Sequence, residues 1–558
     1  MLFHHLAKTF SELEHTSSGN AMRDILSSFL KKVTKEIDKV CYLTLGTISS
    51  PYDSVVLGMA DQMVLKSIAA VSRKEPAIIK SDFKKYGDVG LVAEKKIKNK
   101  TPTLTVNDVF TQLHAIAQTT GSGSQGKKKK LLSTLFQRST PLEAKYIARI
   151  AVGMLRLGAG DKVLLDSLAL AFTGNKKNNE LEKAYNVCPD IGIIAKALAK
   201  KDIKHISPVI GRPISVMLAQ RAKSLKEIQQ RMPDGIVAEE KYDGERIQIH
   251  KKKDQITFFS RRMDNITAQY PDLLKEVKKI KHNFIAEGEI IAIDKSGNLL
   301  HFQTLMQRRR KHDVESYAQQ IPVVIFFFDI LYFNKSLLDE PYHKRREALK
   351  KLFKENQILK FARHIITKDI DKVEEFFNEC IARGTEGIIA KNINGVYQAG
   401  TRGYNWIKWK KDYVKKLRDT FDLVIVGAFA GKGRRSSAYG AVLCACYNKK
   451  DDVFETLCKL GSGFSDKQLK EMPRILRKYE TKNKPAHLKV HQNMKPDVWF
   501  EPNVVVEVTG AELTRSPLHT AAEKNGKGLA LRFPRFLRFR DDKTAEQATT
   551  TKEVEEMG

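Results

Sequence analysis

A lysine lies among carboxylates in residues 239–246, which read EEKYDGER. Lys241 follows a strand-like run and precedes a glycine turn, with Glu239 two residues before it and Asp243 two residues after it. A lysine amine acts as a nucleophile when its surroundings favour the neutral form. The pattern K-x-D-G also occurs by chance in a lysine-rich chain, so a solvated surface turn is the alternative interpretation.

Further stretches of charged and aromatic residues follow Lys241 in a fixed order. Alone, Glu289 and Glu386 would be ordinary surface acids, and Phe328 would be a core residue at the end of an apolar run. Their order along the chain is what makes a chance coincidence implausible. The stretches are FSRR at 259–262, AEGEII at 286–291, FDILY at 328–332, EGIIAK at 386–391, WIKWKKDY at 406–413 and RFPRF at 532–536.

These stretches together resemble the ordered nucleotidyltransferase motifs of archaeal-type ATP-dependent DNA ligases. The resemblance includes residues 119–172, 496–502 and 515–517, and it extends over most of the chain. It implies a reaction in three steps. The lysine amine attacks the α-phosphorus of ATP, AMP passes to the 5′-phosphate at a nick in duplex DNA, and the 3′-hydroxyl displaces AMP. Such an enzyme would serve replication, repair and recombination.

The resemblance implies that Lys241 is the nucleophile. An amine with an unperturbed pKa of about 10.4 is neutral at pH 7 in only about one molecule in 2,500. We therefore expect partial burial, a bound divalent ion and the neighbouring cations Lys408 and Lys410 to lower the pKa of this lysine. Glu289 and Glu386 would hold Mg²⁺, which takes one or two carboxylates and several waters.

The same resemblance implies the other nucleotide contacts. Lys391, Arg535 and Lys543 also match family positions, but as residue types they do not differ from solvated charges. The implied contacts are Glu239 to adenine, Arg246 and Glu289 at the ribose, Phe328 stacked on the base, Arg261 to phosphate or ribose, and Arg402, Lys408 and Lys410 facing the phosphates.

The composition indicates a polyanionic partner. The 558-residue chain has 97 Lys plus Arg against 65 Asp plus Glu, a formal net charge of +32. Such an excess favours nucleic acid, because Lys and Arg neutralise phosphates. An acidic membrane surface is the rival, but the most apolar run, residues 321–333, contains Pro322 and Asp329 and is too short to span a bilayer. With no secretory signal pattern, we expect an intracellular protein.

The elements that would position these residues fall into a multidomain arrangement. Residues 1–206 carry helical patterns and predict an all-α DNA-binding domain. Residues 207–413 alternate strand-like and helical stretches, which predicts an α/β (α+β) nucleotidyltransferase domain with antiparallel sheets. Short strands with glycine turns in residues 414–543 indicate a small β-barrel, an OB-fold by the resemblance. Residues 544–558 have no apolar period and predict a flexible tail.

Local patterns give finer expectations. Residues 119–130, TTGSGSQGKKKK, predict a flexible loop with a basic end. Residues 141–157 predict an amphipathic helix that Gly158 and Gly160 end, with Asp161 capping the next one. Cys444 and Cys446 alternate along an apolar run and predict strand packing rather than a zinc site. The basic run 308–311 could be a localisation signal, a solvated cluster or a DNA-facing surface.

Partner and activity alternatives remain at this point. RNA ligases and mRNA-capping guanylyltransferases share the lysine chemistry, although the long helical first domain argues against both. A non-enzymatic DNA-packaging protein with a dead pocket is a third possibility. Archaeal relatives often carry a sliding-clamp peptide, a Gln followed by paired aromatics, but residues 94–105, EKKIKNKTPTLT, contain no such pair. We expect a monomer that binds nicked duplex DNA.

Overall fold

The structure, a computed structural model, describes residues 1–33, 35–53, 55–175, 178–222, 224–308, 314–410, 420–431 and 439–557. The chain divides into two compact units, Met1–Trp409 and Lys410–Gly558. No helix among the described residues is long and apolar enough to cross a membrane.

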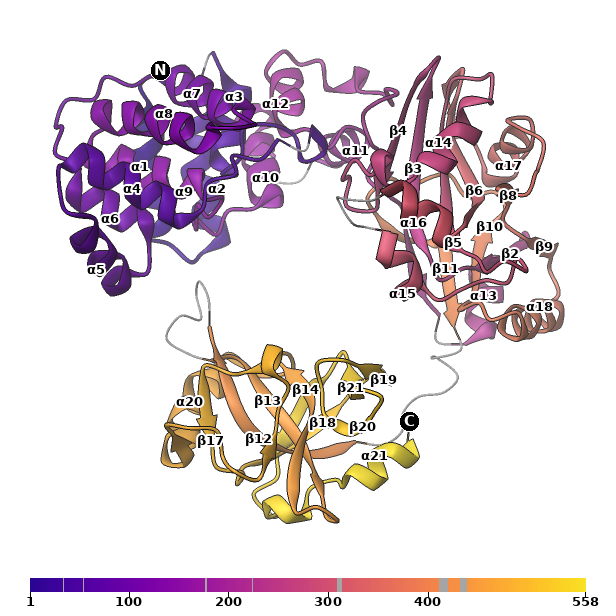
Figure 1. The fold of residues 1–558 in the computed structure, drawn as a ribbon. Coiled ribbons are helices and arrows are strands. Elements are labelled where there is room, and N and C mark those ends of the chain that lie inside the picture. The colour runs from indigo at the N-terminus through magenta and orange to yellow at the C-terminus, as the bar shows by residue number, and fades with distance from the viewer. Residues whose placement is uncertain are drawn as a thin grey trace. The chain divides into compact units, whose positions relative to one another are not determined.

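The first two hundred residues fold into helices, drawn from indigo to magenta in Figure 1. They are α1 (Phe3–Glu14), α2 (Gly19–Leu30), α3 (Ile37–Thr44), α4 (Asp61–Ser72), α5 (Pro76–Tyr86), α6 (Val89–Lys96), α7 (Val106–Gln118), α8 (Ser124–Arg138), α9 (Pro141–Ala151), α10 (Asp161–Thr173), α11 (Asn179–Val187) and α12 (Ile191–Ala199).

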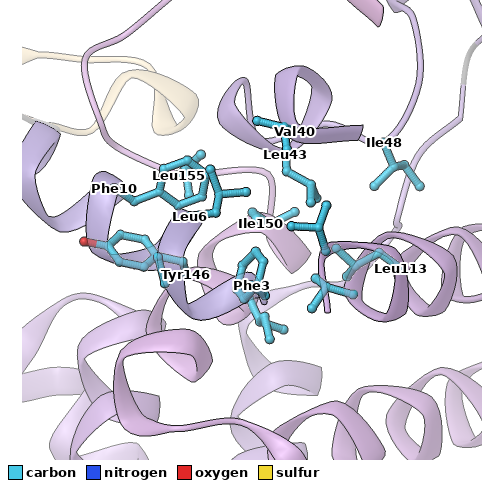
Figure 2. Packing of buried hydrophobic residues seen from close by; sticks show 14 of the residues in the cluster. Phe3, Leu6, Phe10, Val40, Leu43, Ile48, Leu113, Tyr146, Ile150 and Leu155 are labelled. Carbon is cyan, nitrogen blue, oxygen red and sulfur yellow. The ribbon is translucent and has the colours of Figure 1, made fainter. Parts of the chain in front are cut away.

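The core of this helical part forms where α1 and α9 pack together. Phe3, Leu6 and Phe10 recur at helical spacing on α1 and are fully buried. Figure 2 shows them beside Tyr146 and Ile150 of α9. The rings of Phe10 and Tyr146 meet edge to face, with centroids 5.3 Å apart. Apolar burial along one face of α1 against α9, which is buried on all sides from Glu143 to Ala151, therefore holds these two helices together.

Helix α9 begins as the sequence predicts but ends earlier. Its start is set by Pro141 in the first turn and by a capping box in which the Thr140 hydroxyl accepts from the Glu143 N–H and the Glu143 carboxylate accepts from the Thr140 N–H. The helix ends at Ala151, because Gly153 adopts a φ of 69° that breaks the helical path. The predicted cap is also wrong. Asp161 is the first residue of α10, and Gly160 occupies the cap.

The predicted flexible loop at 119–130 is wrong in its second half. Helix α8 starts at Ser124, so the four consecutive lysines at 127–130 lie on a helix. Lysine has a good helix propensity, and the apolar residues that follow, Leu132, Leu135 and Phe136, are buried. That packing anchors the helix. The lysines are presented on it in a fixed arrangement, with Lys127, Lys129 and Lys130 exposed.

Residues 218–410 contain two sheets. The five-stranded sheet has the order β1-β11-β10-β2-β9, and the six-stranded sheet has the order β4-β3-β5-β6-β7, with β8 paired to β6. Most neighbouring strands are antiparallel, as predicted, while β1 with β11 and β6 with β8 are parallel. The strands are β1 (Leu218–Arg221), β2 (Ile236–Lys241), β3 (Glu245–Lys252), β4 (Gln255–Ser260), β5 (Phe284–Ala292), β6 (Val323–Phe333), β7 (Lys335–Ser336), β8 (Leu359–Phe361), β9 (His364–Thr367), β10 (Gly387–Asn392) and β11 (Arg402–Lys410).

Helices cover these sheets, and α17 packs against β6. The apolar core of the six-stranded sheet includes Phe258, Phe284 and Phe327, all fully buried. The helices of this region are α13 (Leu225–Arg231), α14 (Pro271–Lys278), α15 (Phe302–Leu305), α16 (Val314–Gln320), α17 (Tyr342–Lys350) and α18 (Ile370–Ala382).

The second unit is built on a curled eight-stranded sheet (Figure 1). Strand β12 pairs with β13 along its length, but its first half pairs with β18 on the other side and its second half with β17. A bulge between Ile425 and Gly427 separates the two halves and bends the strand. Cys444 and Cys446 are buried on β13, so the prediction of strand packing is confirmed.

The elements of this unit are drawn from orange to yellow. A smaller sheet has the order β19-β21-β20. The elements are β12 (Phe421–Ala430), β13 (Tyr439–Asn448), β14 (Val453–Leu460), α20 (Asp466–Leu476), β15 (Glu480–Thr481), β16 (Leu488–Lys489), β17 (Val498–Phe500), β18 (Val505–Thr509), β19 (Glu512–Ser516), β20 (Ala521–Lys524), β21 (Lys527–Arg532), β22 (Arg535–Phe539) and α21 (Thr551–Met557).

In place of the flexible tail predicted at 544–558, the structure has the helix α21. Val554 is fully buried in the core of the curled sheet, and the Thr551 hydroxyl donates to Glu455 Oε2 at 3.0 Å. The Thr550 hydroxyl accepts from the Glu553 N–H at 3.2 Å and starts the helix. One apolar residue and two threonine hydroxyls are too weak a pattern to predict a helix from sequence.

We expect Val554→Asp to detach α21, because it buries an unpaired carboxylate, which costs about 3 kcal/mol or more. Hydrogen–deuterium exchange of the full chain should then speed up at residues 551–557 and in β13, which α21 contacts. Lys552→Asp, on the exposed side of the same helix, is the matched control. Equal exchange in the two variants would contradict this account of the tail.

Candidate active site

Lys241 is the last residue of β2. Its carbonyl accepts from the Glu386 N–H at 3.0 Å, and Gly387 of β10 lies opposite it in the sheet. The chain then turns through Gly244 into β3. A Cβ at that glycine would collide with the Ile290 carbonyl oxygen of β5, so the turn can pack this closely only with glycine. The K-x-D-G pattern therefore marks a strand end pressed against a second sheet.

The amine of Lys241 forms an ion pair with Glu386, with Nζ 2.5 Å from Oε2. Both side chains are about one-quarter exposed, at 22% and 25%. We expected cations beside this lysine, and the contact found here is a carboxylate. The pair holds the amine in place and leaves it partly exposed.

Two further carboxylates lie near this pair. Burial raises the pKa of Glu289 to about 7 against the opposing charges of Lys241 and Arg246, and the negative charges of Glu386 and Asp243 add to the rise. Burial and the neighbouring Glu386 also raise the pKa of Asp243. The three acids therefore repel one another around one lysine. Among the described residues, no group of three or more His, Cys, Asp or Glu could hold a metal ion through protein ligands alone.

Arg246 lies on β3 directly opposite Glu289 of β5. Its guanidinium donates to Glu287 Oε2 at 2.9 Å and to the Met217 carbonyl at 2.8 Å. The same group lies over two aromatic rings, 5.3 Å from the Phe328 centroid and 5.2 Å from the Trp406 centroid. Arg246 is thus held in one orientation between a carboxylate and an aromatic wall.

That wall consists of Phe328 and Trp406. Their rings meet edge to face with centroids 6.0 Å apart, and both side chains are less than a tenth exposed. A planar base can stack against such a surface. Trp406 also contacts Tyr397 edge to face at 5.9 Å.

Glu239, two residues before Lys241, has both carboxylate oxygens engaged. Oε1 lies 2.6 Å from Lys391 Nζ, and Oε2 accepts from the Tyr342 hydroxyl at 3.0 Å. Arg346 Nη1 lies 3.8 Å from Oε2. Burial lowers the pKa of Lys391 and the charge of Glu239 raises it, with burial the stronger effect. Burial also keeps the pKa of Tyr342 well above its usual value, so its hydroxyl stays a donor.

Strand alternation puts the main residues on one face of the five-stranded sheet. Side chains two residues apart share a face, so Glu239 goes with Lys241 on β2. Lys391 of β10 contacts both Glu239 and, at 4.7 Å, the Trp406 ring of β11, so it joins the same face. The positions after Trp406 on that face of β11 are Lys408 and Lys410.

The remaining predicted residues lie on the surface. Arg261 is exposed in the turn after β4, and Arg402 is exposed at the start of β11. The prediction that the basic run 308–311 is exposed is wrong for Arg308. It is 1% exposed and paired with Asp272 at 2.7 Å, so it does not face DNA, while residues 309–311 lie outside the described residues.

Sequence reasoning missed several residues that build the site. Tyr342 and Arg346 lie in a stretch, YHKRRE, that has the charges of a solvated helix, and no pattern marks either as buried. Glu287 and Tyr397 join Arg246 in a buried hydrogen-bond network. The sequence marks Lys391 as a match to a family position but assigns it no role. Only the fold brings these groups together.

Three family models match the chain. "DNA ligase N terminus" matches residues 2–169, "ATP dependent DNA ligase domain" matches 216–410, and "ATP dependent DNA ligase C terminal region" matches 435–543. Each of these models describes one part of a ligase, and the three follow in order along the chain.

Curated relatives match over the whole length. A protein named DNA ligase 1 from Methanosarcina mazei is 42% identical over 575 residues, covering 100% of this chain and 99% of its own. DNA ligases from Pyrobaculum islandicum and Saccharolobus solfataricus are 42% and 41% identical, covering 100% of this chain and 98% and 97% of their own. A solved structure titled Pmar-Lig_PreS3 aligns with a TM-score of 0.57 at 18% identity, over 96% of this chain and 99% of its own, and shows likeness of fold.

The raised pKa of Glu289 makes a prediction about stability. Below pH 4.5 the carboxyl is protonated in both folded and unfolded chains. Between pH 4.5 and about 7 only the folded chain keeps the proton, so stability falls as pH rises through this window. In metal-free buffer with EDTA, the free energy of unfolding of the parent protein should fall by about 3 kcal/mol more between pH 4.5 and pH 8 than that of Glu289→Gln, which lacks this carboxyl.

Urea unfolding of both proteins from pH 4.5 to 8 measures the effect. Glu374→Gln, at an exposed position on α18, is the control and should follow the parent protein. Parallel pH profiles for the parent protein and Glu289→Gln would rule out the proposed environment of Glu289.

Proposed function

The chain belongs to the family of ATP-dependent DNA ligases, and from this membership we propose that Lys241 carries AMP from ATP to the 5′-phosphate of a nick in duplex DNA. The observation that supports the proposal most strongly is the shared sheet face. It carries Glu239, Lys241, Lys391 and Trp406, with Lys408 and Lys410 further along β11.

In the first step the amine of Lys241 attacks the α-phosphorus. An ammonium has no lone pair, so the proton must leave Nζ before the N–P bond forms. Glu386 Oε2, 2.5 Å away, is the acceptor at hand. The bond from phosphorus to the bridging oxygen then breaks, and pyrophosphate leaves. Lys408, Lys410, Arg402 and Arg261 would neutralise the phosphate oxygens during this step.

The nucleoside would fill the buried end of the site. Phe328 would stack on the base, and Glu239 would accept a hydrogen bond from adenine. Arg246 and Glu289 would lie at the ribose. Burial of Glu239 and Phe328, at 3% and 9% exposure, fits groups that meet the least solvated part of the nucleotide.

Mg²⁺ fits the acidic end of the site. The negative charges of Glu386 and Asp243 contribute to the raised pKa of Glu289. A divalent cation would relieve the repulsion among these carboxylates. Two carboxylates, Glu289 and Glu386, with phosphate oxygens and water complete the set that Mg²⁺ usually takes. Bound there, Mg²⁺ would neutralise charge that gathers on the phosphate oxygens.

In the domain arrangement we propose, residues 1–206 bind DNA, 207–413 carry out nucleotidyl transfer and 414–543 form an OB-fold. The 413/414 boundary lies outside the described residues. The contacts to DNA would be to backbone phosphates, because a ligase must seal any sequence. We further propose that the enzyme acts inside the cell as a monomer, and that any sliding clamp is bound through a surface other than residues 94–105.

Lys241→Arg tests the proposed nucleophile, because it keeps the positive charge and removes the amine. We expect no labelled adduct from α-labelled ATP and a loss of nick sealing on the order of a thousandfold or more. Sealing of a nick that already carries 5′-AMP should survive, since that substrate bypasses the first two steps. Lys252→Arg, at an exposed position on β3, is the control. An adduct mapped by mass spectrometry to another residue would overturn the assignment.

The exposed lysines of α8 test the DNA contact. Each lysine that neutralises a phosphate adds about −0.9 to the log–log dependence of binding on salt. Lys129→Ala with Lys130→Ala should therefore flatten the slope by one to two such increments and weaken binding equally for all sequences. Lys372→Ala, among acidic residues on α18, should leave the slope unchanged. An unchanged slope in the α8 variant would exclude these lysines from the DNA contact.

A further inference from the structure

Helix α17 buries polar side chains where an ordinary surface helix would bury apolar ones. Tyr342, Arg345 and Arg346 are 1%, 0% and 6% exposed. Guanidinium groups are buried only at high cost unless they are paired and hydrogen-bonded. The partners of these side chains therefore show what the helix does.

Arg345 fixes the strand that carries the aromatic wall. Its Nε lies 2.8 Å from Asp329 Oδ1 and its Nη2 lies 3.0 Å from Oδ2, a bidentate pair with both side chains fully buried. Asp329 directly follows Phe328 on β6. Arg345 Nη1 also donates to the Gly395 carbonyl at 3.1 Å. The position of Phe328 is thus tied to α17.

The other two buried side chains of α17, Tyr342 and Arg346, hold Glu239 of β2 in place. Tyr342 donates to Glu239 Oε2 at 3.0 Å, and Arg346 Nη1 lies 3.8 Å from the same oxygen. The Arg346 guanidinium also donates to the carbonyls of Phe327 at 3.2 Å and Ala362 at 2.6 Å, so it cannot swing away. One helix therefore holds both the residue proposed to stack on the base and the residue proposed to contact its edge.

Lys391 completes the cage around Glu239. Its amine lies 2.6 Å from Oε1 and donates to the Phe328 carbonyl at 3.2 Å. The carboxylate is therefore held between the Lys391 amine on one oxygen and the Tyr342 hydroxyl and Arg346 guanidinium on the other. A charged carboxylate accepts hydrogen bonds and donates none, and it has about four acceptor positions. Lys391 and Tyr342 occupy two of them.

We propose that Tyr342 and Arg346 of α17, with Lys391, are positioning residues that fix Glu239 as a pure acceptor and so select a purine with an amine at position 6, adenine over guanine. The proposal rests on the proposed function, in which Glu239 meets the base. Adenine offers a donor at that edge. Guanine and hypoxanthine offer a carbonyl oxygen, and two acceptors facing each other leave both unpaired.

The test varies the protein and the base together. Formation of the covalent nucleotide adduct is measured with ATP, with purine riboside triphosphate, which lacks the 6-amine, and with GTP. For the parent protein we expect ATP to be preferred over both. In Tyr342→Phe the preference for ATP over purine riboside triphosphate should fall about tenfold, because the acceptor is no longer held in place. The rate with purine riboside triphosphate should change little.

A matched control separates positioning from loss of stability. Tyr270 is likewise fully buried in the same domain, and its hydroxyl donates to Glu245 Oε2 at 2.7 Å. Tyr270→Phe removes a comparable hydrogen bond, and it should keep the parent ratio of ATP to purine riboside triphosphate. If Tyr342→Phe does not fold, Arg346→Lys replaces it, with a smaller expected fall in the same ratio.

The outcomes distinguish this proposal from the proposed function. An adduct at Lys241 with an unchanged ratio in Tyr342→Phe, or in Arg346→Lys where that variant is used, would overturn the positioning role and leave the proposed function standing. An equal fall with all three nucleotides would also overturn it, because it would show a purely structural role. No adduct at Lys241 with any nucleotide in the parent protein would instead overturn the proposed function.

Discussion

The register between β2 and β10 is the constraint on which the site depends. Lys241 lies opposite Gly387, and Glu239 lies opposite Ile389, which leaves Glu239 diagonal to Lys391. Because side chains alternate along a strand, a slip by one residue would turn Lys241 and Glu239 to the far face and bring Glu240 into the site. The ion pair between Glu239 and Lys391 opposes such a slip, since breaking it would leave a charge buried alone.

Glu240 shows how the opposite face contributes. It is 2% exposed, accepts from the Tyr242 hydroxyl at 3.0 Å and pairs with Arg383 at 3.2 Å. Tyr242 stacks on Phe326 with ring centroids 4.1 Å apart. The residues on either side of Lys241 are therefore anchored behind the sheet, which fixes the backbone at Lys241 while its side chain stays partly exposed. The consecutive residues Glu239 and Glu240 thus lie on opposite faces of the sheet and have different partners, because side chains alternate along a strand.

The chemistry-bearing residues could be predicted because the short stretches that carry them follow one another in an order that resembles the family's motifs. In the structure the Lys241 amine lies 2.5 Å from Glu386, and its charge also acts on Glu289. The supporting residues could not be predicted in this way. Tyr342 and Arg346 are separated from Glu239 by about a hundred residues, and their burial depends on how α17 packs on β6. The prediction for Arg308 was wrong for the same reason. Its partner Asp272 is distant in sequence, and a run of arginines suggests an exposed surface.

The two ends of the site are electrostatic opposites. At Glu239 a carboxylate is surrounded by donors and held as an acceptor, while at Glu289 carboxylates meet one another and burial raises the pKa of Glu289 to about 7. The Glu239 carboxylate already has Lys391 and Tyr342 as partners, so little reorganisation of it is needed when a base enters. The second end keeps an excess of negative charge that a cation and its phosphates can balance. A nucleotide whose base is bound at the Glu239 end would bring its α-phosphorus to the Lys241 amine in a defined orientation. Such positioning lowers a reaction barrier substantially. In the proposed function, base recognition and phosphoryl chemistry would therefore be coupled through Glu239 and Lys241, which lie on the same face of β2 only two positions apart.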